Sequence, residues 1–585
     1  MNTIINELTK IVKKAFVECG YSESAGEVIR SNRPDLAQFQ ANGAFLTAKK
    51  YKIPPITIAN NVVEFLSSME IFSNVSVANP GFINISLTDD YIINWVNRMV
   101  DDKYLGIPQI SDEQTIIIDY GGPNIAKPLH VGHLRSAIIG ESIKRIASII
   151  GYNAIGDIHL GDWGMPIGLI IAELEERSSL ECDSVDLSLT SNIKKLTIDD
   201  LNEIYPFASK KSKENNNFKL KAKKITCELQ QGNKEYLYIW NKIVQISIAD
   251  LKQNYSRLNV NFDLWKGESD SEQYIPELID ILTSKKLLKR SLGALIVDVS
   301  KPDDNLCIPP IIIKKSDNSN LYSTTDLATI IQRQKELSPK KYWYVADNRQ
   351  SLHFEQVFRC AQIAGLVHEN VELEFLGFGT MNGKDQKPYK TREGGVMKLS
   401  ELLEMAESKA MERIQNSKHL EASEEEKKEI ARKVSIAAIK FGDLSNNRTK
   451  DYVFDLDKFL AKEGKTGAYI LYTISRINSI VKRAKKVKYN CKLEKLYSDE
   501  ERQILLNVMA TGDVFLHSLK EKAPHYICES VYQIATSFSK FYSNTNIIFE
   551  TDESKRSTWI SLIKIVKIFI MKHLDALGIE SVEQM

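Results

Sequence analysis

The chain has 585 residues, of which 43% are hydrophobic and 26% are charged, and its formal net charge is +1 at pH 7. This length allows three or four domains with ample core, and the composition is typical of a soluble globular protein. The balanced charge excludes a surface that is basic throughout, so any contact with nucleic acid must be local.

The seven cysteines are scattered, and no two of them are spaced as Cys-x-x-Cys. Their odd number and irregular spacing predict reduced thiols in a cytoplasmic chain and no zinc site. The first 20 residues lack the apolar centre of a signal peptide, and no run of 18 apolar residues occurs. We therefore expect a cytoplasmic protein with no membrane span and no resident metal.

The N-terminal region predicts a small α+β module over residues 1–105. Residues 2–50 have a helical pattern with a polar break at 31–35. Residues 75–87 alternate around the turn 79–82, which predicts a turn followed by a strand.

From about residue 106, apolar runs alternate with helical stretches. The expected strands are residues 115–120, 153–160, 342–346 and 372–378. Strands separated by helices predict a Rossmann-like, doubly wound parallel sheet, here assigned to residues 106–397.

A polar, lysine-rich stretch interrupts this domain between about residues 178 and 233, within an insertion that we assign to about 178–300. We expect residues 210–217 to form a mobile surface segment. Their lysines are explained more simply as a solvated face than as a binding patch.

Beyond residue 398 the pattern is almost wholly helical. The expected helices are residues 399–416, 424–441, 467–488, 502–519, 527–542 and 559–577. They predict a helical stem at 398–455 and an all-α helical bundle at 456–585.

The turn between the strand 115–120 and the next helix is the most informative segment. It consists of Pro123, Asn124, Ile125, Ala126, Lys127, Pro128, Leu129, His130, Val131, Gly132 and His133. A helix start has free N–H groups and partial positive charge, which suit a phosphate, and histidine can donate hydrogen bonds to phosphate oxygens. Glycine allows close approach to the backbone. A surface helix cap with solvated histidines is the simpler alternative, but the strand before and the helix after favour a nucleotide-phosphate site.

Two further segments are candidates for the same site. Residues 383–395 have glycines at both ends and four cations between them, so they can close over phosphates or form a basic surface turn. Tyr322 and Asp326 are four residues apart at a helix start. A carboxylate beside an aromatic ring suits a planar guanidinium, although an ordinary helix start is the commoner explanation.

In the bundle, Tyr469, Tyr472 and Arg476 share one face of a predicted helix, and five cations follow them. Such a face can stack on unpaired bases beside a phosphate track. Core packing is the more frequent explanation of a tyrosine stripe.

Together these motifs resemble the class I aminoacyl-tRNA synthetases, and among them the arginyl-tRNA synthetases. His130 to His133 resemble the HIGH signature, within a string Pro-Asn-Ile-Ala-Lys-Pro-x-His-x-Gly-His that is similar to that of the arginine enzymes. Further similar segments span nearly the whole chain: residues 38–42, 161–164, 262–263, 267–269, Tyr322, Asp326, 387–394, 466–467, Tyr469 and the C-terminal Met585.

The resemblance implies roles for individual residues. His130 and His133 contact ATP and stabilise the adenylation transition state, with Gly132 and Lys387 in the same ATP site. The second family signature, usually KMSKS, is replaced here by Lys-Pro-Tyr-Lys-Thr at 387–391. A lysine before HIGH is thought to substitute in many arginine enzymes, so the resemblance implies catalytic roles shared by Lys127 and Lys390. The implied arginine-binding residues are Asp119, Asn124, Tyr322, Asp326 and Gln350. The implied tRNA-contacting residues are Gln40, Asn42, Tyr469, Tyr472, Tyr542 and Met585.

The resemblance thus implies ATP-dependent ligation of L-arginine to tRNA(Arg) through an arginyl-adenylate, with Mg²⁺ accompanying ATP, no DNA partner and a monomeric state. Two departures affect the shape of the site: Gly-Met-Pro-Ile-Gly at 164–168 replaces the expected Gly-Thr-Gln-Phe-Gly, and Gly121-Gly122 replaces a small polar pair. Two alternatives stay open. One is a synthetase-like RNA-binding protein without catalysis. The other is a small-molecule nucleotidyltransferase, in which the helical C-terminus has no role.

Overall fold

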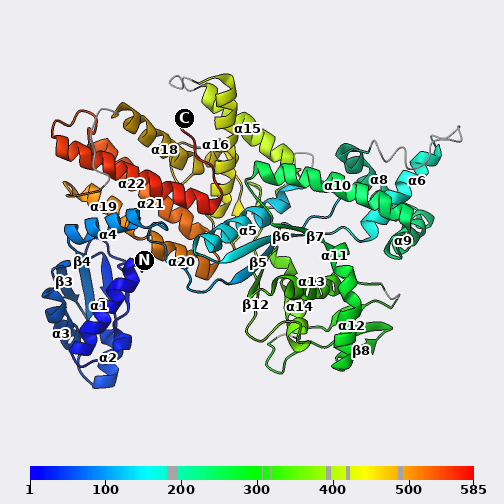
Figure 1. The fold of residues 1–585 in the computed structure, drawn as a ribbon, viewed down its shortest axis with the longest axis horizontal. Helices are drawn as coiled ribbons and strands as arrows, with labels where there is room; N and C mark the ends of the chain where they lie inside the picture. Colours follow the sequence, from blue (N-terminus) through cyan, green and yellow to red (C-terminus); the bar gives the residue numbers. More distant parts are fainter. Residues whose placement is uncertain (181–195, 306, 317–318, 390–396, 417–421, 485–491) are drawn as a thin grey trace.

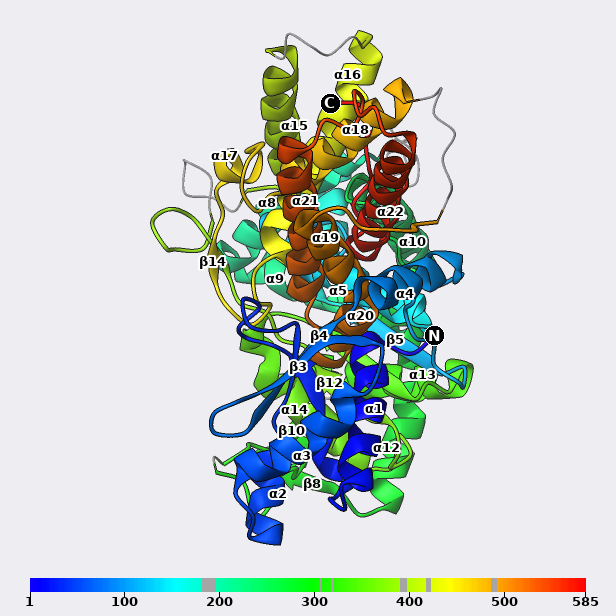
Figure 2. The same cartoon turned by 90° about the vertical axis from the view of Figure 1, so that its left-hand side faces the viewer.

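The computed structural model describes residues 1–180, 196–305, 307–316, 319–389, 397–416, 422–484 and 492–585. Figure 1 shows three parts: an N-terminal module in blue, a central sheet with its insertions in cyan and green, and a helical bundle in yellow to red beside the sheet. The view in Figure 2 places the bundle above the N-terminal module. The predicted fold class, a parallel-sheet domain between an α+β module and an all-α bundle, is confirmed.

The N-terminal module packs helices against an antiparallel sheet of order β1-β2-β4-β3. Its elements are α1 (Ile4–Glu18), β1 (Val28–Arg30), β2 (Phe39–Ala41), α2 (Ala44–Tyr51), α3 (Pro55–Ser67), β3 (Phe72–Ala78), β4 (Phe82–Leu87) and α4 (Asp89–Asp101). The helical prediction for residues 2–50 is wrong at β1 and β2. Each strand has only three residues, too few for alternation to register in the sequence.

The central sheet has five parallel strands in the order β12-β11-β5-β6-β7. They are β5 (Thr115–Tyr120), β6 (Asn153–Leu160), β7 (Leu264–Gly267), β11 (Lys341–Val345) and β12 (Glu372–Phe375). The connecting helices include α5 (Val131–Ile149), α13 (Tyr322–Leu337) and α14 (Ser351–Ile363). From β5 the chain runs one way to β6 and β7, and it then returns on the other side to β11. The carboxyl ends of β5 and β11 are thus the switch point where such sheets bind ligands.

One insertion follows β6 and another follows β7. The first packs α6 (Met165–Leu180) against α8 (Ile198–Glu214), α9 (Asn216–Gln230) and α10 (Lys234–Arg257). The second consists of α11 (Glu268–Ser271), α12 (Ile275–Ser284) and the antiparallel strands β8 (Leu288–Ser291), β9 (Ala294–Val297) and β10 (Ile311–Lys314). The segment 210–217, for which we expected a mobile surface stretch, spans the junction of α8 and α9. The side chain of Asn215 accepts the N–H of Phe218 there and caps α9.

The C-terminal region is helical, as predicted. It contains α15 (Leu399–Gln415), α16 (Glu424–Leu444), α17 (Leu456–Phe459), α18 (Gly467–Arg483), α19 (Asp499–Met509), α20 (Thr511–Glu521), α21 (His525–Asn544) and α22 (Glu553–Leu577). The single helix predicted over 502–519 is two helices that meet at Ala510. The short strands β13 (Met381–Asn382) and β14 (Tyr452–Val453) pair the sheet domain with the stem.

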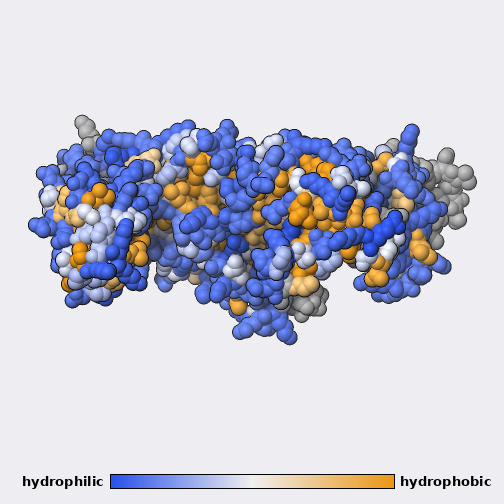
Figure 3. Space-filling view, turned by 90° about the horizontal axis from the view of Figure 1, so that it is seen from below, coloured by the Kyte–Doolittle hydropathy of each residue, from blue (hydrophilic) through white to orange (hydrophobic). Residues whose placement is uncertain are grey.

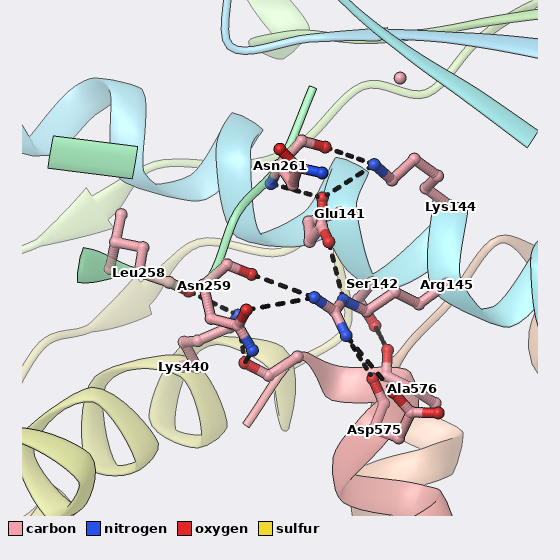
Figure 4. A network of polar contacts seen from close by, with 12 residues as sticks. Glu141, Ser142, Lys144, Arg145, Leu258, Asn259, Asn261, Lys440, Asp575 and Ala576 are labelled. Atoms are coloured by element: carbon pink, nitrogen blue, oxygen red, sulfur yellow. Dashed lines mark hydrogen bonds and ion pairs between the residues drawn. The ribbon is translucent and has the colours of Figure 1, made fainter. Parts of the chain in front are cut away.

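A polar network joins the C-terminal half of α5 to the bundle (Figure 4). Glu141 accepts hydrogen bonds from Tyr120 and Arg145, and Arg145 also contacts Asp575 in α22. The buried Lys440 of α16 donates to the carbonyls of Leu258 and Gly578 at 2.8 and 2.7 Å. Helix α5 is therefore fixed to the bundle at one end, while its other end faces the switch point.

The surface is predominantly polar. Figure 3 shows hydrophilic residues over most of one face, with the hydrophobic residues in separate patches. Among the helices of the described ranges, none has both the length and the apolar content to cross a membrane.

Candidate active site

The turn after β5 fixes two histidines at the start of α5. His130 is the N-cap residue, and its Nδ1 accepts the backbone N–H of Gly132 at 3.1 Å. His133 Nδ1 accepts the backbone N–H of His130 at 3.1 Å, and the two ring centroids are 3.9 Å apart. Because Nδ1 of each ring is an acceptor, a neutral imidazole must carry its proton on Nε2. Each ring therefore keeps one N–H donor available for a ligand.

Burial keeps both rings neutral. It lowers the pKa of His133 to about 3, and it lowers the pKa of His130 together with the nearby positive charge of Lys127. A β-carbon on Gly132 would lie 2.8 Å from the His130 ring. A larger residue here would therefore displace the His130 ring, a second reason for glycine beside the ligand approach that the sequence suggested.

A cavity of about 760 Å³ opens at the switch point. Nearly all the residues proposed for ATP and arginine from the sequence line it: Asp119, Asn124, His130, Gly132, His133, Tyr322, Asp326 and Gln350. They come from β5, the following turn, α13 and the segment after β11. The sheet topology thus brings together side chains that are more than 200 residues apart in sequence.

The lysines that the sequence assigned to ATP do not line the cavity in the described part of the chain. Lys127 is exposed and is not among the residues that line the cavity, and its Nζ lies 5.4 Å from the ring centroid of Tyr205 in α8. Lys387 is also exposed, although its neighbours Pro388 and Tyr389 line the cavity. Lys390 lies outside the described residues.

Several lining residues had no assigned role in the sequence, among them Glu268, His353 and His159. Glu268, at the start of α11, is largely buried, and burial together with Asp162 and Asp326 raises its pKa to about 8. His353 of α14 contacts Asp326, and His159 is the penultimate residue of β6. The only sequence signal for Glu268 was its place in the similar segment 267–269.

The two departures from the family pattern have local structural explanations. Gly121 has φ of +84°, a conformation that favours glycine, and a β-carbon on Gly122 would lie 2.8 Å from the carbonyl oxygen of His159. Pro166 is the second residue of α6, where its missing N–H costs nothing.

The proposed tRNA-contacting residues lie away from the cavity. In the bundle, the Arg476 guanidinium stacks on Tyr472 and Tyr542 at 4.7 and 5.0 Å from the ring centroids. Tyr469 is partly buried and its hydroxyl bonds Ser539. Of the other three, Gln40 donates to Asn84 and Met585 packs on the core. Asn42 directly follows β2, and its side-chain oxygen is buried without a hydrogen-bond partner.

The parallel sheet, its switch-point cavity and the paired histidines at the start of α5 define a class I tRNA synthetase domain. Residues 96–456 match the family model described as tRNA synthetases class I (R), catalytic domain. Residues 2–87 match the arginyl tRNA synthetase N terminal domain, and residues 470–585 match the DALR anticodon binding domain.

The chain belongs to the arginyl-tRNA synthetase family. It is 47% identical to an arginine–tRNA ligase of Alkaliphilus oremlandii and 44% identical to one of Agathobacter rectalis, each over all of both chains. It also matches the crystal structure of arginyl-tRNA synthetase from Plasmodium falciparum at 26% identity, with a TM-score of 0.81 and full coverage of both chains. The Thermus thermophilus arginyl-tRNA synthetase, at 20% identity and a TM-score of 0.80, shares the fold.

Proposed function

We propose that this cavity carries out both steps of arginine–tRNA ligation with the residues assigned above. The main support for the proposal is that one cavity contains both two neutral histidines at the start of α5 and a set of carboxylates. The first group suits the phosphates of ATP, and the second suits a cationic amino acid.

In the first step, an oxygen of the arginine carboxylate attacks the α-phosphate of ATP in line. The bond to the bridging oxygen breaks, pyrophosphate leaves, and arginyl-adenylate forms. The Nε2–H groups of His130 and His133 donate to phosphate oxygens as negative charge develops, and the N-terminus of α5 adds its partial positive charge. Positioning and charge stabilisation supply the catalysis, as in other phosphoryl-type transfers.

Lys127 and Lys390 supply further positive charge to the nucleotide, together with Lys387. Mg²⁺ enters as part of the substrate MgATP, because this ion is bound largely through substrate phosphates.

In the second step, a hydroxyl of the terminal ribose of tRNA attacks the carbonyl carbon of the adenylate, and AMP leaves.

Arginine is held at two ends. Asp119 precedes the histidine turn and Asn124 belongs to it, and both line the cavity. The carboxylate of the substrate arginine must react beside this turn, so we assign both residues to the α-ammonium end of arginine. Asp326, Glu268 and Tyr322 form a second acidic group for the guanidinium, and Gln350 completes the set. Lysine is rejected because its single ammonium group cannot pair with all the acceptors that surround a planar guanidinium, and some acceptors would stay without a hydrogen bond.

The tRNA contacts are assigned to the N-terminal module, through Gln40 and Asn42, and to the bundle, through Tyr469, Tyr472, Tyr542 and Met585. The stacked group of Tyr472, Arg476 and Tyr542 supports base stacking in the bundle. The protein acts as a cytoplasmic monomer in this proposal.

The test is arginine-dependent exchange of pyrophosphate into ATP, measured with and without tRNA. Arginine should support exchange and lysine should not. Lys127→Met and Lys390→Met, compared in the same assay, show how the two lysines share the nucleotide. If no amino acid supports exchange although tRNA binding is intact, the chain is an RNA-binding protein without catalysis.

A further inference from the structure

Three neighbouring strands of the central sheet place an unusual row of polar side chains beneath the cavity. In the register, Asp119 of β5 pairs with Asp157 of β6 on one side and with Tyr344 of β11 on the other. Residues paired in this way point to the same face of a sheet. Two carboxylates and one phenol are thus side by side on that face.

Arg333 of α13 lies over this row and contacts all three members. Its Nη2 donates to Asp119 Oδ2 at 2.5 Å, and its Nε donates to Asp157 Oδ2 at 2.9 Å. Its Nη1 donates to the hydroxyl of Tyr344 at 3.2 Å. Nη2 also lies 2.6 Å from Asp157 Oδ2, so the planar guanidinium contacts all three strands through three nitrogens, a spread of donors that a single ammonium nitrogen cannot match.

Burial does not remove this charge. The Arg333 side chain is only 2% exposed, yet the carboxylates of Asp157 and Asp119 hold its pKa well above the ordinary value against the effect of burial. Asp157 is also fully buried, whereas Asp119 is 17% exposed and lines the cavity. Of the two carboxylates, only Asp119 can meet a ligand.

The same helix supplies a second carboxylate to the cavity. Tyr322, Asp326 and Arg333 are separated by four and seven residues, so they share one face of α13. Asp326 lies in the cavity wall and Arg333 lies two turns deeper, against the sheet. Helix α13 therefore sets the position of both acidic ends of the cavity.

We infer that Arg333 is a positioning residue for the amino acid substrate: it holds Oδ2 of Asp119 so that the other carboxylate oxygen faces the α-ammonium group. This inference rests on the proposed function, because it assumes that the cavity binds arginine. The alternative is that Arg333 only ties the three strands together. If Arg333 has only that structural role, replacing it should weaken binding of arginine and of an analogue without the α-amino group equally.

The test compares wild type with Arg333→Lys, which keeps the charge but cannot reach all three partners, and with Arg333→Gln. Arg359→Lys is the matched control, because Arg359 also pairs with carboxylates, but neither of its partners, Asp304 and Glu355, lines the cavity. The measurements are KM for arginine, KM for ATP, kcat, and the inhibition constant of 5-guanidinovalerate, an arginine analogue without the α-amino group.

In Arg333→Lys we expect KM for arginine to rise roughly tenfold or more, since a hydrogen bond to a charged group is disturbed. The inhibition constant of 5-guanidinovalerate, KM for ATP and kcat should change less than about twofold, and Arg359→Lys should behave like wild type. If Arg333→Gln does not fold, Arg333→Lys alone decides the question.

Two results would overturn the inference while the proposed function stands: an unchanged KM for arginine, or equal weakening of arginine and 5-guanidinovalerate. Failure of the wild-type protein to charge tRNA with arginine would overturn the proposed function and the inference with it. A second test uses the Asp119→Asn background, in which Arg333→Lys should raise KM for arginine no further.

Discussion

Nε2 of His353 lies 2.6 Å from Oδ2 of Asp326 in the wall of the cavity. The contact orients the carboxylate that we assign to the guanidinium. Replacing His353 by alanine removes a hydrogen bond to a charged group, so KM for arginine should rise about five- to tenfold with little change in kcat. Steady-state charging kinetics measure this effect. His517→Ala, at an exposed histidine of α20, is the control and should leave KM unchanged.

Arginine binding should depend on pH through Glu268. Burial and the neighbouring Asp162 and Asp326 raise its pKa to about 8, so the carboxyl is mostly protonated at pH 7 in the free protein. A bound guanidinium favours the carboxylate, and binding therefore releases a proton below pH 8. KM for arginine should fall about tenfold as the pH rises from 6.5 to 8 and then level off.

Titration calorimetry at pH 7 in buffers of different ionisation enthalpy counts the released proton directly. Glu268→Gln should bind arginine more weakly and lose the pH dependence. A wild-type KM that stays flat between pH 6.5 and 8 would contradict the assignment.

His133→Ala should lower kcat for pyrophosphate exchange by about 100-fold, because one fixed donor to the developing charge is lost. KM for arginine should change little, since the ring does not belong to the carboxylate group. The melting temperature should fall by only a few degrees, because the structural loss is one capping hydrogen bond worth about 1 kcal/mol. A large rise in KM with unchanged kcat would instead place His133 in substrate binding.

Lys440 should couple stability to pH. Burial lowers its pKa to about 7, although Glu141 and Glu580 favour the charged form and Arg145 opposes it. A neutral amine has two N–H groups, and the structure offers two carbonyl acceptors, those of Leu258 and Gly578. Between pH 7 and 10 the unfolded chain binds a proton at this lysine and the folded chain does not, so folding becomes more favourable as the pH rises.

Lys440→Met leaves both carbonyls without this donor and should lower the free energy of unfolding by about 2 kcal/mol or more. The difference in melting temperature between wild type and variant should be larger at pH 9 than at pH 7. An equal difference at both values would show that Lys440 stays charged in the folded protein.

The sequence predicted the elements that are long or fully buried. The run 115–120 coincides with β5, because an apolar strand inside a parallel sheet forms a continuous hydrophobic run. The run 153–160 coincides with β6, although that strand also contains Asn153, Asp157 and His159. Strand β7, at the edge of the sheet, was missed because it has four residues and includes a lysine. The break between α19 and α20 was missed because Gly512, two residues after Ala510, is an isolated glycine of the kind that a helical pattern tolerates.

The site was predicted where its chemistry is local in sequence. The histidine turn and the Tyr322–Asp326 pair each lie within one short segment, and both line the cavity. Sequence spacing could not assign Glu268, His353 and Arg333. Each of them contacts its partners only because the folded sheet brings separate segments of the chain together. Their partners lie 11 to 214 residues away along the chain.

Charging of total tRNA with each of the twenty radiolabelled amino acids, by wild type and His133→Ala in parallel, tests the central claim most directly. We predict that arginine alone is charged and that the variant loses this activity while it still binds tRNA. Charging of a different amino acid, or of none with tRNA binding intact, would contradict the account.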